Sequence, residues 1–265
     1  TAKGTNIINL ISIDQDERIE TVLTVNDKIT DGYLFMATKH GIVKKTKLSE
    51  FKNLRKNGLI AISLREGDEL LKVKITKGDA NIILVTQNGN AIRFNERDVR
   101  HMGRTASGVK SMNLKGDDVA VSMDIAVDDE HLLVVSENGY GKRTPIKEYK
   151  VQRRGGSGLI TYKISEKTGK VIGATMCKSE DELMIINSKG IAIRINVEDV
   201  SVTSRSTMGV RLMRTSNEEK IVAIAKISGI EKVEDVQLKL ENPEEVNDDM
   251  LNEVTLVEDN ENIEE

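Results

Sequence analysis

The sequence contains few of the residues on which many catalytic and structural sites depend. Its 265 residues include one cysteine, two prolines, no tryptophan and only 3% aromatic side chains. A single cysteine, Cys177, excludes an intramolecular disulfide and any metal site built from several thiolates. Because Cys177 lies in the apolar stretch VIGATMCKS, we expect it to be a small buried strand residue.

Long apolar runs are also missing from the chain. No run reaches the roughly 18 residues that a membrane span requires, and the N-terminus lacks the basic and apolar regions of a signal peptide. We therefore expect no contact with a membrane and a cytoplasmic location. The first residue is Thr1 rather than Met, so we also expect a fragment of a longer protein.

Motifs that carry catalytic chemistry are absent as well. His40, His101 and His131 fall in a predicted turn, a loop and a strand entry, and none has metal-ligand spacing. The chain has no phosphate-binding loop, nucleophile elbow or dinucleotide-binding fingerprint. We therefore expect no catalytic residue, no metal and no cofactor within this stretch.

The charges that are present are distributed unevenly. Residues 1–230 hold 37 Lys and Arg against 29 Asp and Glu, whereas residues 231–265 hold 2 Lys against 14 acids. The net charges are therefore +8 and −12. A basic body with an acidic tail predicts a polyanion-binding domain that carries its own electrostatic competitor. We place the domain at residues 1–228 and a mostly disordered tail at 229–265.

A repeat of about 50 residues is the clearest pattern in the sequence. Apolar runs lead into turn glycines that are 48, 50 and 51 residues apart: Gly41, Gly89, Gly139 and Gly190. A base follows each glycine at the fourth position: Lys45, Arg93, Arg143 and Arg194. An acid follows at the ninth: Glu50, Asp98, Glu148 and Asp199. We expect each acid either to pair with the base five residues earlier or to accept backbone hydrogen bonds.

Each unit has the pattern of a β-hairpin followed by further strands. The Asn-Gly pairs at 88–89 and 138–139 are strong hairpin turns, and the apolar first strand has the composition of a doubly buried strand. A second glycine series lies in basic loops that precede further strands: Gly4, Gly58, Gly108, Gly158 and Gly209. About four strands per unit and no helix predict an all-β propeller of five to six blades, with a superhelical solenoid as the alternative.

Two details of that propeller are predicted from the hairpins. If the half units at residues 1–25 and 201–228 combine, five blades result; the alternative is a fragment that lacks a blade beginning before Thr1. The first hairpin strand, as in LFMAT and ILVTQ, is expected to be innermost. Because it is apolar throughout, it argues against a propeller enzyme with converging polar groups at a central channel.

Positive charge recurs in the second hairpin strand and in the loop between units, so in a closed propeller it would form a belt around the rim. A belt suits a polymer of phosphates, whose counterions are released on binding. Few aromatic residues argue against single-strand stacking, and the lack of helices argues against major-groove reading. We therefore predict sequence-tolerant binding to bent duplex DNA.

The loop QRRGGSG at residues 152–158 is the richest member of this basic series. We expect Arg153 and Arg154 to contact phosphates, and Gly155 and Gly156 to let the backbone approach closely. The full set of predicted DNA-contacting residues is Lys44, Lys45, Arg55, Lys56, Arg93, Arg100, Arg104, Lys142, Arg143, Gln152, Arg153, Arg154, Gly155, Gly156, Gly158, Arg194 and Arg205.

The stretches MATKHGIVKKTKLSEF, SENGYGKRTPIKEY, QRRGGSG and GVRLMRT closely resemble the C-terminal DNA-wrapping domain of bacterial DNA gyrase A. The resemblance covers about residues 1–228. It implies a six-bladed β-pinwheel, in which neighbouring blades exchange strands and duplex DNA bends around a basic rim. The family's box has the consensus QRRGGKG and lies in the first blade. Here QRRGGSG lies in a later loop, and Ser157 replaces the consensus Lys.

The resemblance also implies what this stretch does not do alone. It would be a non-catalytic part of an ATP-dependent type IIA topoisomerase, with the catalytic tyrosine, ATP and Mg²⁺ in other parts of the enzyme. The implied partners are duplex DNA and the rest of gyrase A, which forms a heterotetramer with gyrase B in the bacterial cytoplasm at the nucleoid. The alternatives are the corresponding domain of topoisomerase IV and a propeller that serves as a protein-interaction scaffold.

Overall fold

The computed structural model describes residues 19–23, 31–52, 58–216 and 218–228. The chain divides into two units, Thr1–Ile227 and Ser228–Glu265. The expected acidic tail at residues 229–265 lies outside the described residues, as does most of the half unit at residues 1–25. All secondary structure described below belongs to the first unit.

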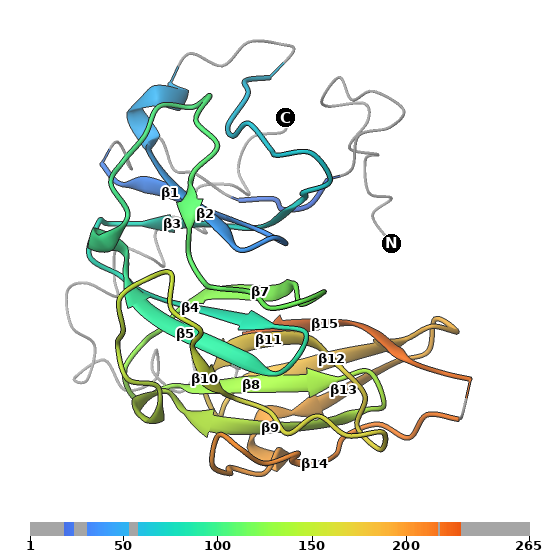
Figure 1. Cartoon of the computed structure of the whole chain (residues 1–265). Helices are drawn as coiled ribbons and strands as arrows, with labels where there is room; N and C mark the ends of the chain where they lie inside the picture. The colour runs from blue at the N-terminus through green and yellow to red at the C-terminus, as the bar shows by residue number, and fades with distance from the viewer. Residues whose placement is uncertain (1–18, 24–30, 53–57, 217, 229–265) are drawn as a thin grey trace, which may run out of the picture. The chain divides into compact units, whose positions relative to one another are not determined.

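The first unit consists of four antiparallel sheets, each built around one β-hairpin (Figure 1). In order, the first sheet contains β3 (Leu70–Thr76), β1 (Tyr33–Thr38), β2 (Ile42–Lys47) and β6 (Val109–Lys110). The second contains β10 (Leu159–Ile160), β5 (Asn90–Asn95), β4 (Asn81–Thr86) and β7 (Ala120–Ile125). The third contains β11 (Val171–Cys177), β8 (His131–Ser136), β9 (Tyr140–Pro145) and β14 (Val210–Arg211). The fourth contains β13 (Ala192–Asn196), β12 (Glu182–Asn187) and β15 (Ile221–Ile227).

Neighbouring sheets exchange a short strand. The two-residue strand β6 follows the hairpin of the second sheet in the chain, yet it pairs with β2 of the first sheet. Strands β10 and β14 repeat this arrangement with β5 and β9. Each exchanged strand begins after a glycine of the second series. The four sheets confirm the all-β propeller expected from the repeat, and the exchange confirms the pinwheel variant that the resemblance implied.

Of the two alternatives for the half units, the one in which residues 201–228 contribute to a fifth blade is wrong. This segment supplies β14 to the third sheet and β15 to the fourth, so it completes existing blades. The described residues thus account for four sheets rather than five or six. Within those residues, no fourth strand pairs with the outer edge of β13.

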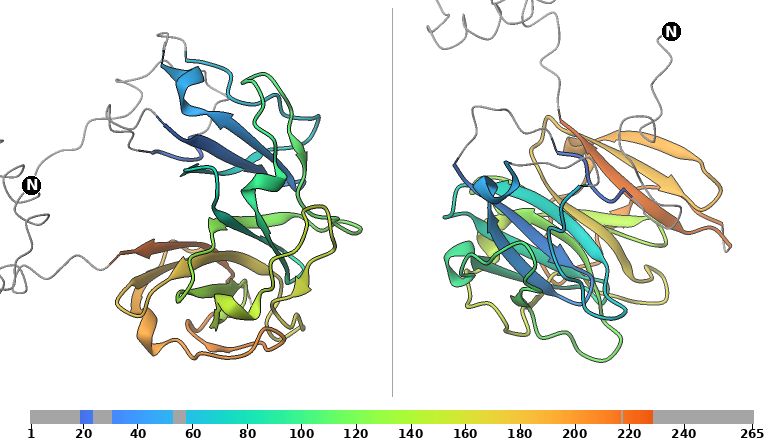
Figure 2. Two further views of the ribbon diagram at one scale, coloured as in Figure 1. Left: turned by 90° about the vertical axis from the view of Figure 1, so that its left-hand side faces the viewer. Right: turned by 90° about the horizontal axis from the view of Figure 1, so that it is seen from above.

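The position predicted for the first hairpin strand is also wrong. In each sheet it is the second strand, because a strand from after the hairpin packs on its inner side. Neighbouring sheets contact one another through these inner strands, which are β3, β7, β11 and β15 (Figure 2). Apolar composition did not reveal this order, because inner strands such as β11 (VIGATMC) and β15 (IVAIAKI) are also largely apolar.

The hydrophobic core lies between successive sheets. Between the first two sheets, Phe35 and Phe94 pack with ring centroids 6.4 Å apart, and both are fully buried. The first hairpin strands β1, β4 and β8 are buried on both faces, as predicted. Cys177 is also buried, as predicted, and burial raises the pKa of its thiol to about 12.

One element type was not expected from the sequence. A single turn of 3-10 helix follows each hairpin: η2 (Leu48–Phe51), η3 (Glu96–Asp98), η4 (Ile146–Glu148) and η5 (Val197–Asp199). The turn is closed by a hydrogen bond such as that from the Val99 amide to the Glu96 carbonyl. These turns position the acid that follows each turn glycine by nine residues.

Candidate nucleic-acid interface

The basic loops lie along the outer side of the sheets. After the 3-10 turns η3, η4 and η5 the chain runs parallel to the second hairpin strand of the preceding sheet. This alignment is fixed by single bridges between Lys45 and His101, Arg93 and Val151, and Arg143 and Val202. The chain then forms the exchanged outer strand. The loops at residues 100–108, 151–158 and 202–209 therefore occupy equivalent outer positions on three successive sheets.

Two predicted contact residues in the hairpin strands are fully buried. The Lys44 ammonium donates to the carbonyl of Ala61 at 2.6 Å and to that of Arg104. Lys142 donates in the same way to the carbonyls of Ser204 and Arg205, each at 2.5 Å. Burial lowers the pKa of both amines, that of Lys142 to about 8. These lysines hold the basic loops against the sheets.

The bases four residues after the turn glycines anchor the next 3-10 turn. Lys45 Nζ donates to the Glu96 carbonyl at 2.8 Å, and burial lowers its pKa. Arg143 Nη2 donates to the Glu198 carbonyl at 2.8 Å.

Arg93 follows the same pattern in the second sheet. One of its nitrogens donates to the Ile146 carbonyl at 3.4 Å, and another lies 2.7 Å from the Asp128 carboxylate. Arg194 differs, because it is exposed and pairs with Glu182 of its own sheet.

The repeated acids accept backbone hydrogen bonds in two of the units. Glu50 Oε2 accepts the amide of Arg104 at 3.2 Å, and Glu148 Oε2 accepts that of Arg205 at 3.3 Å. The backbone alternative is therefore the one found at these two positions. The same two loops are held by Lys44 and Lys142, so each is fixed by a cation and an anion from one hairpin.

The loop of residues 152–158 connects three neighbouring segments. Arg154 donates to the carbonyls of Asp98 and Lys110, both at 2.9 Å. The Gly155 amide donates to the Ser111 carbonyl at 2.6 Å. A Cβ atom on Gly158, whose φ is +72°, would lie 2.4 Å from the Ala91 carbonyl oxygen. Glycine is thus required at the point where β10 meets the second sheet.

The remainder of the same loop is placed by backbone contacts. The Gln152 amide donates to the Arg93 carbonyl at 2.7 Å, and the Gly156 carbonyl accepts the Asn113 amide at 2.8 Å. Gly155 has a φ of +85° and open space where a Cβ would be. Such a position allows another molecule to approach the backbone closely.

The remaining predicted bases differ in whether their side chains have hydrogen-bond partners. Arg205 braces its loop as Arg154 does, donating to the Ile160 carbonyl at 3.2 Å. Arg100 and Arg153 are exposed, and among the described residues neither side chain has a hydrogen bond or ion pair. Arg55 and Lys56 lie outside the described residues.

Exposed bases that the sequence reasoning missed lie beside these loops. Lys52 and Lys150 are exposed, and they precede or open the loops that follow the first and third hairpins. Lys52 and Lys150 each lie eleven residues after a turn glycine, as Arg100 does. A search for bases at this position of the repeat could have identified them. Lys110 is exposed on the exchanged strand β6, two residues after Gly108.

The part of the chain that the structure describes contains no group of three or more acidic, histidine or cysteine residues that could hold a metal ion. Among the same residues, no helix is long and apolar enough to cross a membrane.

The family model described as "DNA gyrase C-terminal domain, beta-propeller" matches residues 32–77, 80–126, 130–178 and 181–228. These four matches correspond to the four sheets. The DNA gyrase A protein of Clostridium acetobutylicum is 56% identical over 247 residues, or 93% of this chain and 29% of that protein. That of Staphylococcus epidermidis is 40% identical over 230 residues, which are 86% of this chain and 26% of that protein. The chain thus spans less than a third of these curated relatives.

Two solved structures are similar to this fold. The C-terminal domain of a DNA topoisomerase IV superimposes with a TM-score of 0.81 at 29% identity, covering 90% of this chain and 75% of that one. A DNA gyrase A C-terminal domain superimposes with a TM-score of 0.76 at 31% identity, covering 85% of this chain and 76% of that one. The family model matches four segments of the chain, and the sequence identity to DNA gyrase A extends over 93% of it, so the two comparisons agree. The chain therefore belongs to the family of DNA gyrase A C-terminal β-propeller domains.

Proposed function

We propose that this chain binds duplex DNA along the outer loops of its sheets and bends it into a wrap, without catalysing a reaction itself. The observation that carries the proposal is the exposure of Arg100 and Arg153 on successive outer loops, where neither has a partner among the residues that the structure describes. Their guanidinium groups are available to phosphates, and neutralising many phosphates releases counterions.

The fold assigns different roles to the bases that the sequence groups together. Buried strand bases hold the loops and the 3-10 turns, so they act on DNA only through loop position. The proposed contact set keeps the exposed and half-buried loop residues and adds the exposed lysines beside them: Lys52, Arg100, Arg104, Lys110, Lys150, Gln152, Arg153, Arg154, Gly155, Gly156, Gly158 and Arg205.

In this proposal the wrapped DNA serves a larger enzyme. The chain spans 29% of the Clostridium acetobutylicum protein. Cleavage chemistry, ATP and Mg²⁺ would belong to parts of that larger enzyme outside this chain. The wrap would present a second DNA segment to the cleavage core, so that strand passage introduces negative supercoils. The partners are then the rest of gyrase A together with gyrase B, at the bacterial nucleoid.

Ligation of a nicked circular plasmid in the presence of the chain tests wrapping directly. A protein that wraps DNA changes the linking number of the closed circle, which a gel resolves after the protein is removed. We expect a shift that grows with protein concentration and is lost at high salt. A ligated product identical to the protein-free control, or no binding of linear duplex, would contradict the proposal and favour a protein-interaction scaffold.

A further inference from the structure

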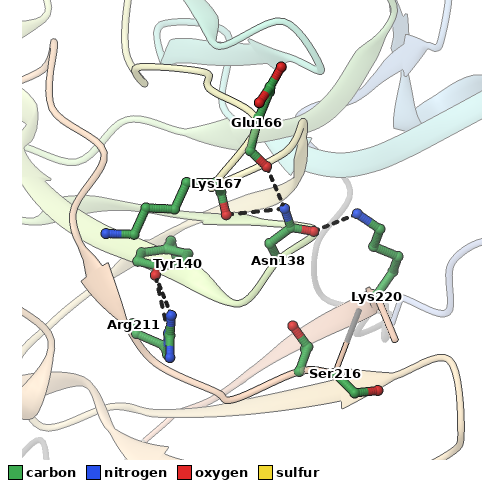
Figure 3. A pocket seen from close by; sticks show the side chains of 8 residues that line it. Asn138, Tyr140, Glu166, Lys167, Arg211, Ser216 and Lys220 are labelled. Carbon is green, nitrogen blue, oxygen red and sulfur yellow. Dashed lines mark hydrogen bonds between the residues drawn. The ribbon is translucent and has the colours of Figure 1, made fainter. Parts of the chain in front are cut away.

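A cavity of about 390 Å³ opens at the hairpin-turn end of the third sheet (Figure 3). It lies between the β8–β9 turn, the loop before β11 and the segment that follows β14. Its volume falls within the range of small-molecule sites, about 300–1,000 Å³. None of the predicted DNA-contacting residues lines it.

The centre of this cavity is a phenol held by a guanidinium. Arg211 Nη2 and Nε lie 2.7 and 3.2 Å from the Tyr140 hydroxyl oxygen, and both donate to it. This hydrogen bonding, with the nearby Lys167, lowers the pKa of Tyr140. Because the phenol oxygen accepts these two bonds, its own O–H is left to donate to a ligand.

The Tyr140–Arg211 pair is specific to one sheet. The two residues face each other across the β9–β14 pairing. The corresponding pairs are Ile42 with Lys110 in the first sheet and Asn90 with Ile160 in the second. In a protein of repeated units, a constellation that occurs once among the described sheets is more specific than a feature present in each of them.

Two further cations reach the same cavity. Lys167 Nζ lies 5.2 Å from the centroid of the Tyr140 ring. Lys220 Nζ donates to the Asn138 side-chain oxygen at 2.5 Å and lies 3.5 Å from Glu137. The remaining lining acid is Glu166, whose carboxylate points away from Asn138 and Tyr140 in Figure 3. The lining therefore includes three cations, which come from β14, from the loop before β11 and from the segment after β14.

We propose that this cavity is a binding site for a phosphate group. A phosphate offers several oxygens in a tetrahedral arrangement, so it can accept from the Tyr140 hydroxyl, the Lys167 ammonium and the remaining N–H groups of Arg211 together. The Ser216 hydroxyl lines the same space and adds a neutral donor. The phosphate can come from the DNA backbone or from a free polyphosphate. The assignment does not depend on DNA wrapping.

Calorimetric titration of inorganic pyrophosphate into the full chain tests the site. Lys167→Gln and Tyr140→Phe each remove one donor, and we expect each to weaken binding about tenfold, the effect of one hydrogen bond to a charged group. Lys178→Gln is the matched control, because Lys178 is exposed, lies outside the cavity and carries the same charge. Circular dichroism verifies that each variant is folded.

A second arm identifies the source of the phosphate. If it is the DNA backbone, a short duplex displaces pyrophosphate and Lys167→Gln weakens duplex binding more than Lys178→Gln does. If it is a free polyphosphate, duplex and pyrophosphate bind at the same time. The assignment is overturned if folded wild-type chain binds no pyrophosphate, or if Lys178→Gln weakens binding as much as Lys167→Gln.

Discussion

Lys44 and Lys142 are fully buried, although an ammonium group is rarely found inside a protein without partners. Each finds two main-chain carbonyls of an outer loop. The carbonyl oxygens compensate for lost hydration, yet burial still lowers the pKa of each amine. A basic residue that recurs in the repeat can therefore stabilise the loop that carries the exposed bases, without contacting DNA itself.

Replacement of Lys142 by Met predicts a change in the pH dependence of stability. The pKa of Lys142 is about 8 in the folded chain and 10.5 when unperturbed, so the unfolded chain binds more protons between these values. The wild-type free energy of unfolding should therefore rise from about pH 8 to about pH 10.5 relative to Lys142→Met. Urea unfolding at a series of pH values measures this difference. Parallel curves for the two proteins would contradict it.

Gly155 and Gly158 of the same loop can be compared with each other. Both have positive φ, but a Cβ on Gly158 would collide with the Ala91 carbonyl, whereas Gly155 faces open space. Gly155→Ala should cost only the left-handed backbone strain, about 1–2 kcal/mol. Gly158→Ala should cost about 3 kcal/mol, because the outer strand must also move away. Equal losses of unfolding free energy would show that the close contact does not matter.

The exchanged outer strands determine how the elements hold together. Each is two residues long, and two of them are held by an arginine from the next connecting loop. Arg154 donates to the Lys110 carbonyl of β6, and Arg205 donates to the Ile160 carbonyl of β10. Arg154 bridges the 3-10 turn η3 and strand β6, which belong to two different sheets. Of the two adjacent arginines in this loop, Arg154 thus contributes to stability between blades, whereas Arg153 is left to contribute to DNA binding alone.

Substitution of Arg153 and Arg154 by Gln separates these two roles. Arg154→Gln removes two main-chain hydrogen bonds and should lower the free energy of unfolding by about 1–2 kcal/mol. Arg153→Gln should change stability by less than about 0.5 kcal/mol. It should instead reduce the slope of log K for duplex DNA against log salt by about 0.9. Chemical unfolding and fluorescence-anisotropy binding measure the two effects; identical behaviour of the two variants would refute this division.

At the scale of elements, the hairpins could be predicted from local sequence. The exchange of a short strand between neighbouring sheets could not be predicted from residue patterns. Turn glycines, Asn-Gly pairs and apolar runs define β1, β2 and their counterparts locally. Strand β6 has only two residues and pairs with Ile42 and Val43, more than sixty positions earlier, so no local periodicity indicates its partner. The first hairpin strand was wrongly predicted to be innermost for a related reason. The contacts between neighbouring sheets, which are made by β3, β7, β11 and β15, cannot be identified from the sequence of one strand.

In the whole molecule, the repeat places equivalent basic loops on successive sheets. The propeller fold and the outer position of the basic loops were predicted from four aligned copies, whereas the family was predicted from the resemblance of particular stretches such as SENGYGKRTPIKEY. The contact set could not be sorted by sequence, because Lys45 and Arg93 look as available as Arg100 and Arg153. Only tertiary packing shows that the first two donate to the next 3-10 turn, while the latter two are exposed and have no partner within the described part of the chain.

The central claim is that exposed loop bases, and not the buried strand bases, form the DNA-binding belt. The most direct test is the salt dependence of duplex affinity for the chain and for the variant with Lys52, Arg100, Lys150 and Arg153 changed to Gln. We predict that the slope of log K against log salt falls by about 3.6, or about 0.9 for each lost phosphate contact, in a protein of unchanged stability. An unchanged slope in the folded variant would contradict the account.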